Sequence, residues 1–250
     1  MSKADDRRKA REAAALERQR QEQRKRRLVV GGVVVAVLAV VLGIGIAVQA
    51  SRDTTGEAAA VVPGSSEAAA PDAVTADYGV VVGDADAPVT ITLYEDLQCP
   101  ICAGLEAAVG DRLNDAIDAG QVQVEYRMVS FLDGESENEY SSRALNALLA
   151  TLDSGGVDAF KTLHDQLYAA QPAEGTAGPE DAELIADAVA AGAEESTVRE
   201  PIEDKAYAQW IKNATDAMSR NGVNGTPTVF VDGERMGGDP AQAVLDALGG

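Results

Sequence analysis

Two kinds of hydrophobic pattern follow one another along this chain. Residues 28–48 form an apolar stretch of 21 residues without a charge, and a helix of that length matches the ~30 Å hydrocarbon core of a bilayer. After Tyr78 the pattern changes to short β-branched runs and amphipathic segments. The sequence therefore predicts a transmembrane anchor at residues 28–48 and a globular domain at residues 78–250.

The globular part predicts an α/β fold. Runs rich in Val, Ile and Thr predict strands at residues 80–82, 89–94, 122–129 and 228–231, and the hairpin turn at Asp232-Gly233 predicts a short strand at residues 234–236. Apolar residues at helical spacing predict a helix over 99–118, a final helix over 239–248 and four amphipathic stretches between residues 137 and 219. Two of those stretches are separated by Gly155-Gly156. The expected order is β-β-α-β, four helices, then β-β-α.

Charge separates the N-terminal segments from the domain. Residues 1–27 hold 11 basic and 5 acidic residues, which predicts a basic cytoplasmic tail, because positive charge flanks the inner side of a membrane span. A cleaved signal peptide is the alternative, although residues 28–48 exceed the usual apolar length of such peptides. Residues 49–77 are rich in Ala, Ser and Pro and predict a flexible linker with nothing to bury.

The remaining chain is strongly acidic. Residues 28–250 carry 10 basic and 36 acidic residues, a net charge of −26. Such a surface repels phosphates, so nucleic acid is excluded as a partner. Whether residues 28–48 are a retained anchor or a cleaved signal peptide, the domain is expected outside the cytoplasm. A pair of cysteines there is expected to be redox-active or to form a structural disulfide.

The two cysteines, Cys99 and Cys102, stand at a predicted strand-to-helix junction. At a helix N-terminus the first cysteine lies beside unpaired N–H groups and the positive end of the helix dipole, which favour its thiolate. Pro100 suits the first helical turn, and Cys102 is placed to resolve a mixed disulfide formed at Cys99. Three alternatives stay open: a zinc site completed by His164 and carboxylates, a structural disulfide, which would close only a small loop, and two inert thiols.

A second group of residues, Gly225-Thr226-Pro227-Thr228, comes directly before a predicted strand. Proline is tolerated at a strand start because it need not donate there. Together, the sequences YEDLQCPIC and NGTPTVFVDGER resemble the DsbA-like branch of the thioredoxin superfamily. The resemblance covers about residues 78–250 and implies a thioredoxin-like fold with a helical insertion at about 137–219. It also implies a cis Pro227 beside the cysteines and a Thr226 main chain that receives the substrate peptide.

Two departures from that family concern the active site. Ile101 stands where DsbA has histidine, so we expect the pair to oxidise less strongly than DsbA. Leu93 occupies the position of the buried acid of many thioredoxins. Glu95 and Asp96 are closer to Cys99 in the sequence than Leu93 is. They are either proton acceptors for Cys102 or loop carboxylates at a strand end.

The expected function is dithiol–disulfide exchange on exported, cysteine-containing client proteins. Cys99 and Cys102 are the expected catalytic residues, Thr226 and Pro227 bind substrate, and Pro100, Ile101, Glu95 and Asp96 modulate the site. A membrane oxidase is the expected recycling partner, and no metal or organic cofactor is expected beyond the redox-active disulfide. A reductase or isomerase is the alternative enzyme, and a redox-silent acidic scaffold is the alternative from another class. His164 is interpreted as a buried structural residue.

Overall fold

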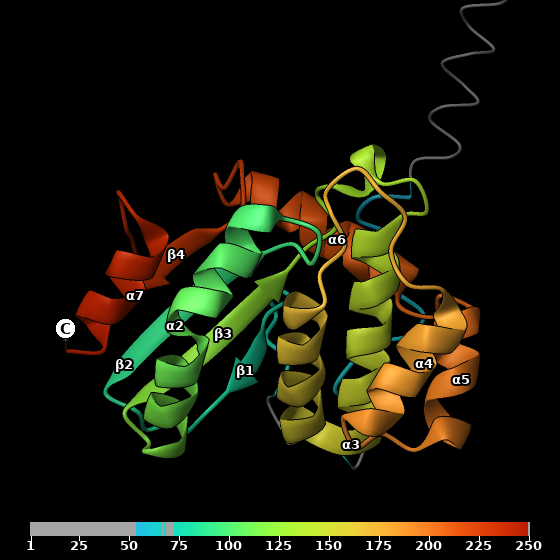
Figure 1. Cartoon of the computed structure of the whole chain (residues 1–250), viewed down its shortest axis with the longest axis horizontal. Helices are drawn as coiled ribbons and strands as arrows, with labels where there is room; N and C mark the ends of the chain where they lie inside the picture. The colour runs from blue at the N-terminus through green and yellow to red at the C-terminus, as the bar shows by residue number, and fades with distance from the viewer. Residues whose placement is uncertain (1–53, 67, 69–72, 250) are drawn as a thin grey trace, which may run out of the picture. The chain divides into compact units, whose positions relative to one another are not determined.

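Five strands form one mixed sheet in the computed structural model, which describes residues 54–66, 68 and 73–249. Its order is β1-β3-β2-β4-β5 (Figure 1). The strands are β1 (Val80–Val82), β2 (Val89–Glu95), β3 (Val122–Met128), β4 (Thr228–Val231) and β5 (Glu234–Arg235). Strands β2 and β3 are parallel, and the other neighbouring pairs are antiparallel. The central strand is β2, as its β-branched sequence predicts.

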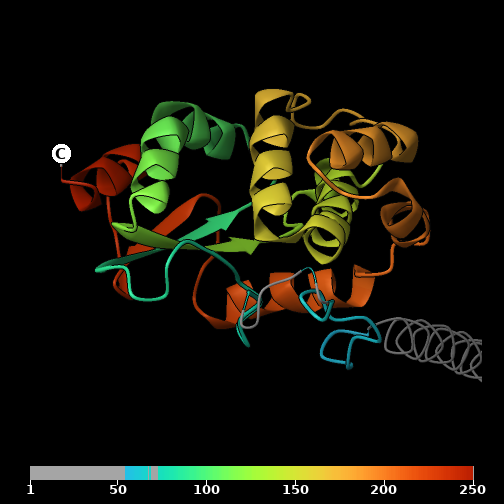
Figure 2. The ribbon, with the colours of Figure 1, turned by 90° about the horizontal axis from the view of Figure 1, so that it is seen from below.

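Helices cover both faces of this sheet. They are α2 (Pro100–Asp118), α3 (Tyr140–Ala169), α4 (Asp181–Ala190), α5 (Glu195–Glu203), α6 (Ala208–Arg220) and α7 (Pro240–Ala247), with a short 3₁₀ turn η1 (Asp133–Glu135). Helices α2 and α7 lie on one face and α6 on the other (Figure 2). The parallel pair β2–β3 requires a crossover, which α2 provides. The order of strands and helices follows the sequence-based expectation except for the additional helix α5.

Helix α3 is broken where two glycines were expected to interrupt it. Gly156 has φ 79° and ψ −169°, and the helix reverses there, so its two halves lie side by side (Figures 1 and 2). A Cβ atom on Gly156 would lie 2.8 Å from the carbonyl oxygen of Ala68. Glycine is therefore required both by the backbone conformation and by the close approach of another segment.

The helical insertion differs in two respects from the segment expected at 137–219. Helix α6 packs on the sheet, since Met218 joins Tyr94 of β2 and Val129 in a buried cluster. The insertion therefore consists of α3–α5, and the second half of α3 also packs on the sheet, where Phe160 and His164 contact Tyr126 of β3. Helix α5 was not anticipated, because it contains Pro201 and buries only Val198 and Ile202.

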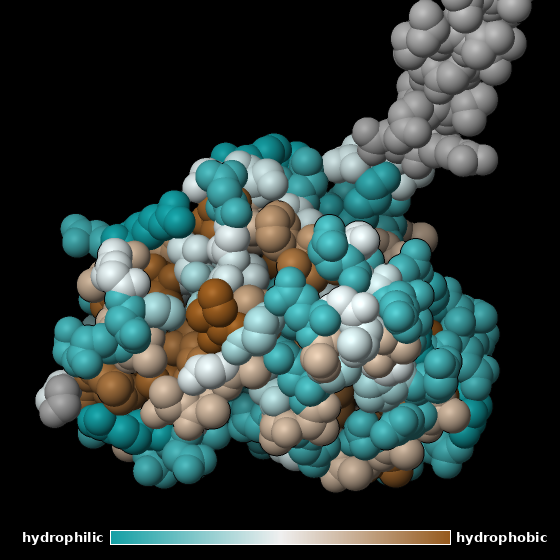
Figure 3. Space-filling model, turned by 45° about the horizontal axis from the view of Figure 1, so that its top comes forward, coloured by the Kyte–Doolittle hydropathy of each residue, from teal (hydrophilic) through white to brown (hydrophobic). Residues whose placement is uncertain are grey.

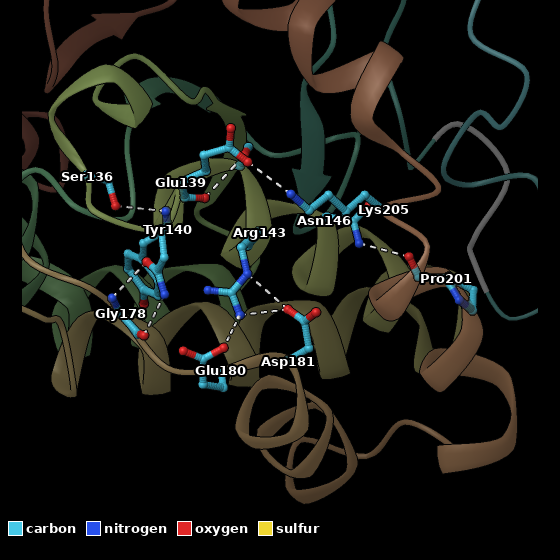
Figure 4. Close-up of polar contacts among 12 residues, drawn as sticks. Ser136, Glu139, Tyr140, Arg143, Asn146, Gly178, Glu180, Asp181, Pro201 and Lys205 are labelled. Carbon is cyan, nitrogen blue, oxygen red and sulfur yellow. Dashed lines mark hydrogen bonds and ion pairs between the residues drawn. The ribbon is translucent and has the colours of Figure 1, made fainter.

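Polar contacts join the helices of the insertion (Figure 4). The guanidinium of Arg143 on α3 donates to Asp181 Oδ1 on α4 at 2.6 Å and lies 4.0 Å from Glu180. The amide of Asn146 donates to the carbonyl oxygen of Pro201 at 2.9 Å. These contacts fix α4 and α5 against the first half of α3.

The segment before Tyr78 differs from the linker expected at 49–77. Residues 55–66, here called the N-terminal strap, lie against the helices. Gly56 N–H donates to Asn213 Oδ1 at 2.8 Å, and Gly64 N–H donates to Asp153 Oδ1 at 2.6 Å. Pro63 is buried. The compact unit therefore begins at Thr55, because main-chain hydrogen bonds attach a segment whose side chains gave no sign of packing.

The expected anchor at residues 28–48 and the basic tail at 1–27 lie outside the described residues. Within the part of the chain that the structure describes, none of the helices combines the length and apolarity needed to cross a membrane.

Candidate active site

The two cysteines lie at the junction between the end of β2 and the start of α2. Cys99 is the N-cap residue of α2 and Pro100 occupies its first turn. The N–H of Cys102 donates to Cys99 Sγ at 3.4 Å, so the sulfur acts as the capping acceptor. Both cysteines are free thiols. The sulfur of Cys99 therefore meets the unpaired N–H groups at the positive end of the helix.

This position sets the acidity of Cys99. A hydrogen bond from the Cys102 side chain, a hydrogen bond from the Thr226 side chain and the N–H groups of Cys102 and Ile101 together lower the pKa of Cys99 to about 6, against the opposing effect of burial. A thiol with that pKa is mostly a thiolate at neutral pH, and the thiolate is the nucleophile in disulfide exchange.

Cys102 has the opposite character. It is fully buried, and burial raises its pKa well above the ordinary range, helped by the hydrogen bond to Cys99 and by the negative charge of Glu95. The pair thus consists of one ionised sulfur at the helix end and one protonated sulfur inside the core. Such a division suits an attacking and a resolving thiol.

The second predicted group of residues meets the first across the sheet. Strand β4 pairs with β2 so that Thr228 lies opposite Tyr94, and the preceding loop reaches Cys99. The main-chain oxygen of Thr226 lies 3.4 Å from Cys99 Sγ. The Thr226–Pro227 peptide bond is cis. The structure therefore brings together Cys99, Cys102, Thr226 and Pro227 in one site.

Ile101 lies on the surface of this site. Its side chain is 62% exposed, more than the other exposed large hydrophobic residues among those described. In Figure 3, hydrophobic side chains gather over the half of the visible face that contains the sheet and α2, whereas the half over α4 and α5 is mostly hydrophilic.

Glu95 is the last residue of β2 and Asp96 follows it in the turn, and both side chains are buried. Asp96 organises the turn before Cys99: its carboxylate accepts from Gln98 N–H at 2.8 Å, from Leu132 N–H at 2.8 Å and from the Ser141 hydroxyl at 2.6 Å. These bonds hold the turn to the insertion. Asp96 therefore positions the cysteines.

Glu95 faces the core. Burial and the charge of Glu106 raise the pKa of Glu95 to about 7, and its charge acts on Cys102. Glu95 Oε2 lies 3.4 Å from Nε2 of His164, which is fully buried on α3. Burial would lower the pKa of His164, but Asp165 and Glu95 outweigh it and raise that pKa to about 9.

Glu106 on α2 was not singled out in the sequence, and its carboxylate belongs to the same group. Within the described part of the chain, Glu95, Glu106 and His164 each offer one ligand atom within 4.8 Å of the others. Their buried positions depend on how α2, β2 and α3 pack together. The spacing of Glu106 from Cys102 gave no separate signal, because acidic residues are frequent throughout this chain.

Comparison with known proteins decides the family. The family model described as Thioredoxin matches residues 75–248. The chain belongs to the thioredoxin family. Within it, the chain is DsbA-like: it superposes on the reduced disulfide bond oxidoreductase DsbG of Mycobacterium tuberculosis with a TM-score of 0.59 and 30% identity, covering 68% of this chain and 85% of that one. Reduced DsbA of the same organism gives a TM-score of 0.59 and 29% identity, covering 68% and 90%.

A similar domain also occurs inside longer proteins. The Na(+)/H(+) antiporter NhaA 3 of Salinispora tropica is 32% identical over 165 residues, which are 66% of this chain but only 23% of the antiporter. This thioredoxin-family chain thus spans less than a quarter of that curated relative. The solved neighbours are DsbA-like thiol–disulfide oxidoreductases, and the expected thioredoxin-like fold with a helical insertion is confirmed.

Proposed function

We propose that this chain catalyses dithiol–disulfide exchange with client proteins and that it works in the oxidising direction. The observation that carries the proposal is the contrast between the two sulfurs. Cys99 has a pKa of about 6 at the helix end, whereas Cys102 is fully buried with a raised pKa. Only Cys99 combines a thiolate with a place beside the Thr226 loop.

In the oxidising direction the enzyme begins with a Cys99–Cys102 disulfide. A client thiolate attacks Cys99 Sγ, the S–S bond breaks, and Cys102 leaves with the electron pair and takes up a proton. A second client thiolate then attacks the client sulfur of the mixed disulfide and releases the Cys99 thiolate. The client loses two electrons and gains a disulfide, and the enzyme pair gains those electrons. The sulfurs hold the electrons, so no organic cofactor is needed.

The Thr226 carbonyl and the exposed Ile101 are the proposed client contacts. A carbonyl beside the nucleophile accepts a hydrogen bond from the main chain of an extended peptide, which is independent of the client's sequence. Ile101 supplies an apolar surface next to the same sulfur. Unfolded, cysteine-containing proteins expose both kinds of group, so they are the proposed substrate class.

The low pKa of Cys99 supports oxidation. Whatever stabilises the thiolate stabilises the reduced enzyme, and a stable reduced form makes the disulfide a stronger oxidant. Two features make the disulfide a weaker oxidant: the negative charge of Glu95, and an isoleucine instead of a histidine at position 101. These two features favour a reductase or isomerase as the second candidate. A redox-silent scaffold would not require the acidity difference between the two thiols.

The proposed location is the outer side of a membrane. Residues 28–48 are apolar and follow the basic cluster at residues 24–27, which supports an anchor with its N-terminus in the cytoplasm. Clients would then be exported proteins, and a membrane oxidase would regenerate the Cys99–Cys102 disulfide.

The reduction potential tests the direction of exchange. The full chain would be equilibrated with glutathione mixtures and the fraction of free thiol measured. We expect a value between those of thioredoxin (about −270 mV) and DsbA (about −120 mV), together with oxidation of a reduced client that has two cysteines. A potential at or below that of thioredoxin would favour the reductase, and a pair that does not cycle would favour the scaffold.

A further inference from the structure

Unpaired polar atoms converge in the core behind the cysteines. They come from Glu95 at the end of β2, Glu106 on α2, Tyr126 on β3 and His164 on α3. Oε1 of Glu95, Oε1 of Glu106 and the hydroxyl of Tyr126 are buried without a hydrogen-bond partner among the described residues, and Oε2 of Glu95 and Nε2 of His164 have only the 3.4 Å ion-pair contact with each other. Buried polar groups normally have partners, because burying one without a partner forfeits its hydrogen bonds to water. Several at one point indicate a place built for a ligand.

The spacing of these atoms matches that of metal ligands. Glu95, Glu106 and His164 each place one donor atom within 4.8 Å of the others, and His164 Nε2 lies 3.4 Å from Glu95 Oε2. Bonds of about 2.1 Å to a tetrahedral ion place two ligand atoms roughly 3.4 Å apart. The separation of His164 Nε2 and Glu95 Oε2 equals that value.

The other ring nitrogen of His164 is held as it is in metal-binding histidines. Nδ1 lies 3.0 Å from Asp165 Oδ1, and Asn114 donates to the second oxygen of Asp165 at 3.1 Å. An Nδ1–H that donates to a carboxylate fixes the ring orientation, and it leaves the Nε2 lone pair for an ion once that ion displaces the Nε2 proton. The imidazole is further fixed between the rings of Tyr126 and Tyr168, at centroid distances of 4.6 and 4.9 Å.

One of these residues, Glu106, also lines a surface pocket. A surface pocket of about 300 Å³ between α2 and α3 has Glu106, Asp111, Asp165 and Tyr168 in its wall. Three of these side chains are carboxylates, which attract cations. Glu106 belongs both to this wall and to the buried group, so it connects the pocket with the buried donor atoms.

We propose that Glu95, Glu106 and His164 bind one divalent transition-metal ion, with Zn²⁺ as the best-suited ion. One imidazole and two carboxylates are ligands that Zn²⁺ accepts, and its preference for four ligands leaves one further position. The charge of the ion balances the two carboxylates. The site does not depend on the proposed thiol exchange, although Glu95 also acts on Cys102, so the ion would lie next to the buried thiol.

Zinc titration of the full chain in detergent tests this assignment. The chain should carry Cys99→Ser and Cys102→Ser, because free thiols bind zinc themselves, and this keeps the test separate from exchange activity. After removal of metal, equilibrium dialysis should show one Zn²⁺ per chain. Glu95→Gln and His164→Gln should each weaken binding at least about tenfold, and Asp165→Asn about tenfold. Glu137→Gln, at an exposed carboxylate outside the pocket wall, should leave binding unchanged.

The single histidine of the chain gives a second readout that needs no ligand variant. Nitrogen NMR of the imidazole should show the Nε2 resonance shifting as Zn²⁺ is added, while Nδ1 keeps its proton. Stoichiometric binding with that shift would establish the site. Absence of binding, an unchanged imidazole spectrum, or binding that survives both Glu95→Gln and His164→Gln would overturn it.

Discussion

Cys99 Sγ lies 3.4 Å from the main-chain oxygen of Thr226, although 127 positions separate the two residues. The contact exists because β4 pairs with β2 in a register that sets Thr228 opposite Tyr94. The loop before β4 and the turn after β2 therefore emerge at the same edge of the sheet. A client bound along Thr226 would meet Cys99 and not Cys102.

The first prediction concerns the division of labour between the cysteines. Cys102→Ser should leave a protein that attacks clients and cannot resolve them, so mixed disulfides accumulate as high-mass bands that a reductant removes. Cys99→Ser should trap almost no client and lose exchange activity, because the buried sulfur at position 102 has a raised pKa and no access to solvent. The opposite trapping pattern would mean that the roles are reversed.

The second prediction is a pH dependence set by Cys99. Its pKa is lowered to about 6, so alkylation of the reduced protein by iodoacetamide should have a midpoint near pH 6. At pH 5 about one tenth of Cys99 is thiolate, so the alkylation rate there should be about tenfold lower than the rate reached well above pH 6. Cys102→Ala should move the midpoint upward, since it removes the largest stabilising hydrogen bond. A midpoint near the ordinary value of a free thiol would contradict this account.

The same shift should appear in the reduction potential. Below pH 6 the pair takes up two protons per two electrons, and above pH 6 Cys99 remains ionised and only one proton is taken up. The potential should therefore fall by about 59 mV per pH unit below pH 6 and by about 30 mV above it. The low pKa of Cys99 also makes the stability of the reduced protein depend on pH. Ionisation of Cys99 stabilises the folded state fully at any pH above the pKa that this thiol has in the unfolded chain. That stabilisation is lost as the pH falls through 6.

The third prediction concerns Ile101. An imidazole at this exposed position would add a hydrogen-bond donor and, when protonated, a positive charge beside the Cys99 thiolate. Ile101→His should therefore raise the reduction potential by about 30 mV for each tenfold stabilisation of the reduced pair. Ile101→Leu is the matched control and should change little. An unchanged or more negative value in Ile101→His would show that side chain 101 does not face the sulfur.

The fourth prediction concerns the N-terminal strap. Asp153 accepts from Gly64 N–H with one oxygen and from the Tyr207 hydroxyl with the other, each at 2.6 Å. Asp153→Ala should lower the free energy of unfolding by about 1–3 kcal/mol and should speed proteolytic cleavage within residues 55–66. Asp158→Ala, at an exposed position of the same helix, should do neither. Equal cleavage rates in the two variants would show that Asp153 does not hold the strap.

The sequence anticipated those parts of the molecule that local chemistry determines. The strands, the start of α2 at Cys99 and the break in α3 follow from β-branched runs, from a proline in the first helical turn and from a glycine pair. The meeting of Cys99 with Thr226 required the family resemblance, because nothing local links residues so far apart.

Other features depend on packing that a single sequence does not encode locally. The strap is attached through the N–H groups of Gly56 and Gly64, and main-chain contacts leave no trace in composition. The role of Asp96 depends on Ser141, a residue 45 positions away. Glu106 joins Glu95 and His164 only because α3 folds back against α2.

The reversal at Gly156 limits which amino-acid substitutions this chain can accept. Its backbone angles fall in a region that glycine alone occupies readily, and a Cβ there would approach Ala68. A Cβ on the neighbouring Gly155 would lie 3.0 Å from the carbonyl oxygen of Gly192. Every amino-acid replacement at either codon adds that atom. Two adjacent codons far from the cysteines should therefore tolerate almost no replacement in a saturation library, although neither takes part in the chemistry.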